Sequence, residues 1–315
     1  MSGASGSGRS VLQSSGRRKS RTFSIGFLAP ALILYAVFFI YPTLDAFRIS
    51  LYDWTGFSLR TATYVGLANF REAIVYDKWF RLAAVNNVWI MVGGGLLMFA
   101  FALYSARALT ARKIGGRALY KTLIFLPYVI NVVGVALLWG FILQPRFGLL
   151  NSALRLVGLP NLAKVWLGSR GLAMAWIIFI IVWRSVGFYM VWFIAGMEGV
   201  PSEMHDAARV DGANEAQLFF RITLPLMRDV LAIALVNWGI AALRVFGVVW
   251  VLTGGAPANT THTVATYMMQ HVQPRGGIAA FRTGYGTALA VLLFIAVFAL
   301  SLVFFRLRGK ESIEY

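Results

Sequence analysis

Residues 201–225 read PSEMHDAARVDGANEAQLFFRITLP, a charged segment that separates two long apolar runs. Ser202 is a good helix-capping residue, and Glu203 and Asp206 follow it within the next turn. Both features favour a helix start, because a cap accepts hydrogen bonds from free backbone amides and negative charge is stabilised at a helix N-terminus. Gly212 then predicts a turn, since glycine readily adopts the left-handed backbone on which many helices end.

A second short helix is predicted after this turn. Asn214 is followed three residues later by Gln217, a spacing that resembles a capping box. Pro225 is expected to end this helix, because proline has no backbone amide to donate. The segment is therefore predicted to form a helix, a turn and a second helix, held in water between two membrane spans.

The composition independently indicates a membrane protein. Hydrophobic residues make up 59% of the chain and charged residues 13%, with a mean hydropathy of +0.70, whereas a soluble domain is about half apolar and one quarter charged. The net charge of +17 would also suit a nucleic-acid-binding protein, but basic loops between apolar spans produce it too, and the hydropathy favours the membrane. The absence of cysteine excludes disulfides and thiolate metal sites; the three histidines are scattered, so no metal site is predicted.

Six apolar runs are long enough to cross a bilayer, which takes about 20 residues for a helix. Their predicted cores are residues 25–46, 84–106, 122–143, 172–195, 230–252 and 284–305. The chain is therefore predicted to be an all-α integral membrane protein whose six transmembrane helices occupy residues 25–305.

The two ends of the chain are predicted to be tails. Residues 1–24 are rich in Gly, Ser and basic residues, a composition that indicates disorder, and residues 306–315 form a short C-terminal tail. A basic start before an apolar run also fits a signal peptide, but this run is long for one and lacks a small-residue cleavage site. A retained first span is the preferred interpretation.

Basic residues in the connecting segments predict which side of the membrane each segment faces. Lys and Arg are more numerous in the N-terminal tail and alternate loops than in the remaining loops, and positive charge favours the cytoplasmic side. The predicted inner segments are 107–121, 196–228 and 306–315, and the outer segments are 48–81, 146–170 and 253–282. Both termini and residues 201–225 are thus predicted to be cytoplasmic.

The spacing within residues 201–225 resembles the EAA loop, the signature of permease subunits in binding-protein-dependent ABC importers. That signature reads E-A-A, three residues, G, nine residues, I-x-L-P. The matching positions here are Asp206, Ala207, Ala208, Gly212, Ile222, Leu224 and Pro225. Asp206 stands where the family usually has Glu, which keeps the charge and shortens the side chain.

Other stretches are similar to the carbohydrate-uptake branch of this family, of the maltose-permease type. Residues 64–70 (YVGLANF) resemble its V-G-L-x-N-F segment, and residues 125–127 (FLP) the start of its third span. Residues 251–257 (VLTGGAP) resemble its L-T-G-G-G-P stretch, with Ala256 in place of Gly. The resemblance covers roughly residues 25–305, places the EAA-like loop between spans four and five, and implies a sugar as the transported substrate.

The chain has no visible means of harvesting energy by itself. It lacks the G-x-x-x-x-G-K-[ST] phosphate loop, and Asp45 and Asp229 lie near span ends, whereas ion-coupled carriers usually need an acid within the membrane. The family resemblance implies that two cytoplasmic ATPase subunits supply the energy and hold the ATP and Mg²⁺, so this chain would be non-catalytic and bind no cofactor. Residues 202–210 would dock on the ATPase, with Glu203 and Asp206 meeting its donors.

The resemblance also implies further partners and a location. A second homologous permease would complete the pore, and an extracytoplasmic sugar-binding protein would deliver the substrate to the outer loops. The chain would then be a multi-pass protein of a bacterial or archaeal plasma membrane.

Two arginines, Arg184 and Arg244, lie within predicted spans, where a charge costs about 2.5–3.5 kcal/mol on insertion scales. Each could line the translocation path, or could be a structural arginine bonded to a neighbouring helix. Sugars bind through hydroxyl hydrogen bonds and aromatic faces, so nearby residues of both kinds are candidates for the path. The candidate set is Asn131, Trp183, Arg184, Phe188, Tyr189, Asn237, Trp238 and Arg244.

Three other functions were compared with sugar transport. A phosphate-bearing substrate such as glycerol-3-phosphate would suit two arginines in the path. A membrane-embedded enzyme needs clustered His, Asp or Glu near a membrane face, and the cluster in residues 201–225 is better explained by docking. A passive channel would show a filter-like repeat or a charged ring, and the sequence shows neither.

Overall fold

A computed structural model of the chain describes residues 25, 27–58, 60, 62–111, 115–273 and 281–308. The predicted N-terminal tail lies outside the described residues, as do most of the C-terminal tail and parts of the loops 107–121 and 253–282.

Within the described residues, five helices are long and apolar enough to cross a membrane, and they confirm the predicted all-α class. They are Phe27–Ile49, which ends in α2 (Tyr41–Ile49); Lys78–Thr110, formed by α4 (Lys78–Trp89), the π-helical Ile90–Gly94 and α5 (Gly95–Ala111); α9 (Arg170–Glu198); Arg228–Leu252, formed by α13 (Arg228–Leu243) and α14 (Gly247–Leu252); and α16 (Thr283–Arg308).

The predicted third span is not one straight helix. It consists of α6 (Arg117–Val129) and α7 (Val132–Ile142), which meet at a bend of 95°. The backbone of Ile130 is extended, and the Asn131 side chain accepts a hydrogen bond from the Val133 amide at 2.8 Å. Asn131 therefore starts a new helix inside the apolar run. If this pair crosses the membrane as one span, the described residues contain six, as predicted.

The remaining elements are short and lie at the ends of the spans. They are β1 (Tyr52–Asp53) and β2 (Thr63–Tyr64), which pair antiparallel; α3 (Ala68–Arg71) and Glu72–Tyr76; α8 (Leu149–Leu156) and Pro160–Leu162; α10 (Ser202–Val210), α11 (Glu215–Gln217), Leu218–Thr223 and α12 (Leu224–Leu226); and α15 (Val264–Val272).

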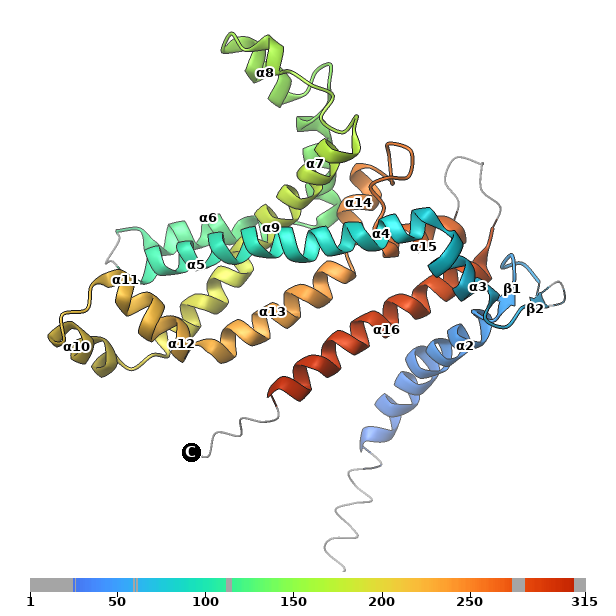
Figure 1. The fold of residues 1–315 in the computed structure, drawn as a ribbon, viewed down its shortest axis with the longest axis horizontal. Helices are drawn as coiled ribbons and strands as arrows, with labels where there is room; N and C mark the ends of the chain where they lie inside the picture. Colours follow the sequence, from blue (N-terminus) through green and yellow to red (C-terminus); the bar gives the residue numbers. More distant parts are fainter. Residues whose placement is uncertain are drawn as a thin grey trace, which may run out of the picture.

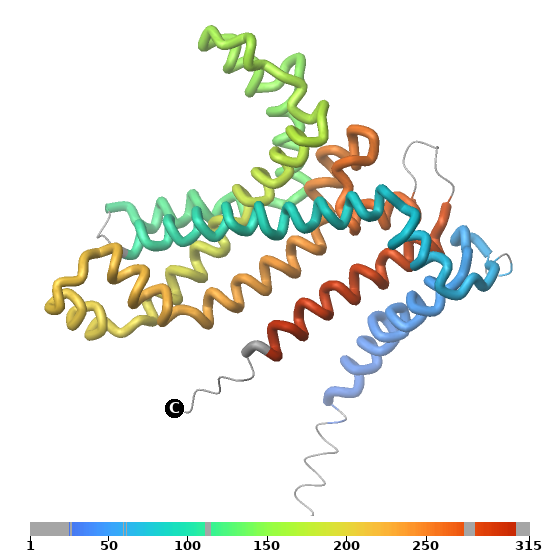
Figure 2. The backbone as a smooth tube through the Cα atoms, in the orientation of Figure 1, coloured from blue at the N-terminus to red at the C-terminus, as the bar shows by residue number. Residues whose placement is uncertain are grey.

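The long helices run side by side between two structurally different ends (Figure 1). The α10–α12 segment lies at one end of the bundle, and β1, β2 and α3 lie at the other. The α7–α8 arm projects away from the bundle, and Figure 2 shows the same path as a tube. The segment with the EAA-like spacing is therefore separated by the whole length of the bundle from the β1–β2 end.

The core is centred on α9, which packs against both α5 and α6. Met190, Phe193 and Ile194 of α9 are almost completely buried in it. Gly187 is where α6 comes closest, because a Cβ atom at that position would overlap the backbone carbonyl of Ile124. The pair α6 and α9 is thus held in contact along a surface that has no room for a larger side chain.

The break between α13 and α14 is stabilised from a neighbouring span. Asn87 on α4 donates from Nδ2 to the carbonyls of Ala242 (2.7 Å) and Leu243 (3.1 Å), and its Oδ1 accepts from the Val264 amide at 2.9 Å. Thr263 Oγ1 donates to the Val245 carbonyl at 2.6 Å. These bonds satisfy carbonyls that would otherwise end a helix without partners.

A polar cluster connects α4, α15 and α16 at the β1–β2 end. The hydroxyls of Tyr267 and Tyr285 donate to Asp77 Oδ2 at 2.7 and 2.6 Å, and Asp77 Oδ1 caps α4. Arg282 forms two hydrogen bonds with the Glu72 carboxylate, at 2.8 and 2.7 Å. The cluster joins residues that lie far apart in the sequence, since Asp77 and Tyr285 are separated by 208 positions.

Burial and nearby hydrogen bonds set the protonation states of the ionisable side chains at the β1–β2 end. Burial lowers the pKa of His262 and of His271 to about 4, and the Arg282 charge adds to the effect on His271, while Asp77 and Glu72 oppose it there. Burial acts to raise the pKa of Asp77, but the hydrogen bonds from Tyr285, Tyr267 and two backbone amides outweigh it and lower that pKa. Both histidines are therefore neutral, and Asp77 charged, at neutral pH.

Acid is expected to destabilise the fold through these histidines. Their pKa is about 6.5 when unfolded and about 4 when folded, so the unfolded chain binds protons first and stability falls as pH drops from about 6.5 towards 4. Thermal unfolding in detergent across this range checks the sign. The variant His271→Gln should show a shallower fall than the native chain; an equal slope in both would contradict the assignment.

Removing the Asn87 side chain should cost far more than removing Asn131. Asn87→Ala leaves buried carbonyls without donors, at about 1–3 kcal/mol for each unsatisfied group, whereas Asn131→Ala removes an exposed helix cap worth about 1 kcal/mol. Comparing the unfolding free energies of both variants in the same detergent tests the prediction. Equal losses would mean that Asn87 does not hold the break.

Candidate functional site

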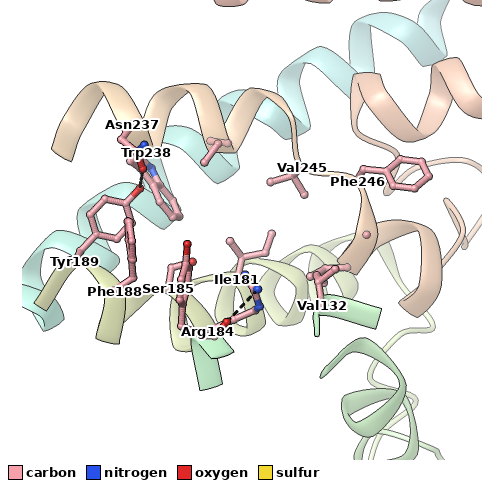
Figure 3. A pocket seen from close by; sticks show the side chains of 15 residues that line it. Val132, Ile181, Arg184, Ser185, Phe188, Tyr189, Asn237, Trp238, Val245 and Phe246 are labelled. Carbon is pink, nitrogen blue, oxygen red and sulfur yellow. Dashed lines mark hydrogen bonds between the residues drawn. The ribbon is translucent and has the colours of Figure 1, made fainter. Parts of the chain in front are cut away.

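A cavity of about 300 Å³ lies where the two broken spans meet α9. Its walls come from the α6–α7 bend, the middle of α9, the second half of α13 and the start of α14 (Figure 3). Tyr128, Arg184, Ser185, Asn237 and Trp238 contribute its polar groups. Both breaks in the backbone therefore open onto one shared cavity.

Arg184 is the charged side chain among the residues that line this cavity. Its Nη2 donates to the Tyr128 carbonyl at 3.2 Å, and its guanidinium carbon lies 5.1 Å from the centre of the Tyr128 ring. Tyr128 in turn stacks on Phe188, with ring centres 4.5 Å apart. Arg184 Nε is buried and makes no hydrogen bond to any residue in the described ranges, so this buried donor lacks the partner that such groups usually have.

A hydrogen bond joins the two spans on the other side of the cavity. The Tyr189 hydroxyl donates to Asn237 Oδ1 at 2.9 Å, which leaves the amide hydrogens of Asn237 for other acceptors (Figure 3). The Tyr189 ring also meets the Trp238 ring edge to face, at 6.0 Å between centres. The cavity thus combines aromatic faces with hydrogen-bond donors.

Trp238 is fixed by a local irregularity in the second span. Its Nε1 donates to the Met91 carbonyl at 2.8 Å, within the π-helical stretch Ile90–Gly94, where the regular helical bonding is interrupted. A Cβ atom at Gly95 would lie 2.7 Å from Trp238 Nε1, so glycine is what permits this approach. The indole is therefore held by the backbone of another span.

The structure brings together five of the residues predicted for the path: Arg184, Phe188, Tyr189, Asn237 and Trp238 all line the cavity. Trp183 instead faces a separate apolar cavity between α5, α6 and α9. Asn131 is exposed and caps α7, and Arg244 is exposed at the end of α13; neither lines the 300 Å³ cavity. Their part in a path stays a prediction.

Sequence reasoning missed several residues of the cavity wall, including Tyr128, Ser185, Val245 and Phe246. Tyr128 follows Pro127 immediately before the bend, and that proline is the one local signal that could have drawn attention to it. The break at Phe246 has no comparable signal, because it depends on Asn87 and Thr263 from distant parts of the chain.

The segment 201–225 forms the predicted helix, turn and second helix. The first helix is α10, and Gly212 has a φ of +81°, in the left-handed region that favours glycine. Asn214 and Gln217 form the predicted capping box, with bonds of 2.9 and 2.8 Å. Glu203, Asp206 and Ala207 are exposed on α10, and Ala208 is half-buried.

Two predictions about the ends of these helices are wrong. Ser202 is the first helical residue and Pro201 occupies the capping position, without a side-chain hydrogen bond. Pro225 does not end the second helix, which continues through α12 (Leu224–Leu226). Its missing amide falls inside this continuous helix, where the π-helical stretch Leu218–Thr223 changes to α12, so one backbone hydrogen bond is absent there.

The second half of the segment is attached to the bundle. Leu218, Phe219 and Thr223 are buried, and Ile222 and Leu224 are half-buried. His205 of α10 forms a hydrogen bond with Thr223 Oγ1 at 3.0 Å, which ties the first helix to the second. The arrangement leaves one face of α10 free and polar on a firmly anchored base.

Across the described residues no group of three or more His, Asp or Glu side chains lies close enough to hold a metal ion. The cavity wall offers aromatic rings and hydrogen-bond donors rather than a nucleophile paired with a base.

Comparisons with known proteins agree with the arrangement of spans. The chain is 34% identical over 290 residues to the probable ABC transporter permease protein YurN of Bacillus subtilis, covering 91% of this chain and 96% of that protein. It is 35% identical over 283 residues to the diacetylchitobiose uptake system permease protein NgcF of Streptomyces coelicolor, covering 86% and 78%.

A solved structure shares the fold. The crystal structure of a bacterial ABC transporter involved in the import of the acidic polysaccharide alginate contains a chain that superposes with a TM-score of 0.79 at 21% identity, covering 96% of this chain and 99% of that one. Residues 98–309 match the model of the family described as the binding-protein-dependent transport system inner membrane component. With two thirds of its length matched, this chain belongs to that family of ABC transporter permeases.

Proposed function

We propose that this permease forms half of the translocation path for a sugar, a mono-, di- or oligosaccharide, in an ATP-driven importer. The observation that carries the proposal is the cavity of about 300 Å³ bordered by two broken spans and α9. Relatives named for the uptake of diacetylchitobiose, trehalose/maltose and alpha-glucosides support a sugar as the substrate.

The chemistry of the cavity suits a sugar. Trp238, Tyr128 and Phe188 offer aromatic surface on which the apolar face of a sugar ring can stack, and the Asn237 amide can donate to its hydroxyls. The site lies within the spans, away from both ends of the bundle (Figures 1 and 3). A substrate bound there would be separated from water on each side by the packed ends of the helices.

The energy for transport would come from partner subunits. We propose that α10 docks on a cytoplasmic ATPase, that two such subunits bind the ATP and Mg²⁺, and that this chain is non-catalytic and holds no cofactor. Exposed Glu203, Asp206 and Ala207 support docking, because they combine acceptors with a small side chain that permits close approach. This orientation places both termini in the cytoplasm of a bacterial or archaeal cell.

The complete importer would contain further proteins. A second homologous permease would enclose the other half of the path, and an extracytoplasmic binding protein would deliver the sugar. The solved alginate ABC transporter in complex with an alginate pentasaccharide-bound periplasmic protein offers a precedent for such a partner.

An anionic substrate is the second candidate. The observation that favours it is Arg184, whose Nε is buried at the cavity wall without a partner among the described residues, while no Asp or Glu lines the same space. Relatives include permeases named for sn-glycerol-3-phosphate and for sulfoquinovosyl glycerol. A carboxylate, sulfonate or phosphate would supply the acceptor that Arg184 lacks.

Docking requires the turn at Gly212. Gly212→Pro should abolish transport while the protein remains inserted, because proline cannot adopt a φ of +81°. Gly212→Asn is the matched control: asparagine tolerates left-handed backbone, and a Cβ there would meet nothing within 4 Å. The measurement is substrate-stimulated ATPase activity and uptake in the reconstituted importer. Normal transport by Gly212→Pro would refute the docking proposal.

Arg184 should distinguish the two substrate classes. Losing a hydrogen bond to a charged group costs about 1.5–3 kcal/mol, so Arg184→Gln should raise KM for uptake at least about tenfold if the substrate is anionic. A neutral sugar should show a much smaller change. Arg306→Gln, at an exposed position near the end of α16 and outside the cavity, is the matched control. Equal effects of both variants would remove Arg184 from the substrate site.

A further inference from the structure

Arg107 of α5 forms a hydrogen bond with residues 201–225, which we call the coupling segment. Arg107, four residues before the end of α5, donates from Nη2 to the Glu215 carbonyl at 2.9 Å. Its guanidinium carbon also lies 4.8 Å from the centre of the Phe219 ring. One side chain thus makes a charge-assisted hydrogen bond and a cation–π contact with the second helix of the segment.

A second arginine ties the other side of the connection between α5 and α6. Arg117, the first residue of α6, pairs with Glu198, the last residue of α9, at 2.6 Å between Nη2 and Oε1. This pair is exposed, so it contributes little energy by itself. It does place both ends of the α5–α6 connection against the junction of α9 and α10.

The contact of Arg107 falls on the part of the segment where its two helices meet. Arg209 of α10 lies 3.5 Å from the Glu215 carboxylate, and His205 bonds to Thr223. A small cavity of about 200 Å³ between these groups is lined by Arg107 as well. Arg107 therefore bonds to Glu215, one of the residues that join α10 to the buried second half of the segment.

From this point a continuous packed route leads to the substrate cavity. α5 and α6 both pack along α9, and Gly187 leaves no room between α6 and α9. The far end of α6 carries Tyr128, whose carbonyl accepts from Arg184 at the cavity wall. The α6 helix, with 13 residues, is a rod of about 20 Å between the connection and the cavity.

We propose that Arg107 is a positioning residue that makes the coupling segment, α5, α6 and α9 move as one body. The segment is joined by the chain to α9 and α13, and Arg107 adds a direct hydrogen bond from α5 to its second helix. With Arg107 in place, a displacement of α10 carries the α6–α7 bend with it. The inference rests on the proposed docking of α10 on an ATPase.

An arginine is required for both contacts at once. The planar guanidinium can present one edge to the Glu215 carbonyl and its face to the Phe219 ring. A lysine keeps the charge and part of the ring contact, but it offers a single flexible ammonium. Arg107→Lys should therefore retain part of the function, and Arg107→Gln should lose it.

The test is the ratio of substrate transported to ATP hydrolysed in the reconstituted importer. Arg107→Gln should lower this ratio about fivefold, a size typical of a coupling interaction between two sites, with Arg107→Lys intermediate. The amount of assembled complex, measured by co-purification of the ATPase, should stay at the native level. Lys121→Gln is the matched control: it removes one positive charge from α6, and Lys121 makes no hydrogen bond or ion pair to any residue the structure describes.

Each outcome decides the proposal. An unchanged ratio in Arg107→Gln, or an equal drop in Lys121→Gln, would overturn it. A loss of assembled complex with the ratio preserved would show that Arg107 has only a structural role, which also overturns it. If the native importer itself shows no stimulated hydrolysis with any candidate substrate, the proposed function fails, and that result is distinct because it does not depend on the variant.

Discussion

The structure depends on one constraint: every backbone group that leaves the helical pattern inside a membrane needs a partner within the protein. Besides the π-helical stretch Ala36–Ile40 of the first span, the described spans depart from regular helix at three places: Ile90–Gly94, residues 130–131 and residues 244–246. Each departure is matched by a side chain: Trp238 bonds to the first, Asn131 caps the second, and Asn87 with Thr263 holds the third. The second and third departures border the 300 Å³ cavity, and Trp238, which bonds to the first, also lines it.

This arrangement explains why the cavity is polar inside an apolar bundle. A straight helix in lipid presents only side chains, whereas a broken one turns its backbone and the start of a new helix towards the break. Val132 and Gly247, the first residues of α7 and α14, both line the cavity. The charge of Arg184 is tolerated there because the Tyr128 carbonyl and ring contact it directly.

What the sequence predicts well is what depends on neighbours in the chain. The turn at Gly212, the capping box of Asn214 and Gln217, and the long apolar runs are local patterns, and the structure contains them. The α13–α14 break was not predictable, because Asn87 lies 155 positions before the carbonyl it satisfies. For the same reason the sequence did not show that α13 ends at Arg244 and that its side chain is exposed there; its part in the path stays a prediction.

Local patterns and contacts between distant residues also play different parts in how motion could pass through the molecule. The exposed residues of α10 all lie in one short segment, whereas the groups that connect α10 to the cavity come from four separate helices. The exposed residues of α10 have room for other side chains, whereas the contact at Gly187 admits no larger residue. The fold combines a rigid base with an exposed face on α10. Leu218 and Phe219, which follow the turn after α10, are buried and form the base, whereas α10 itself has no buried residue.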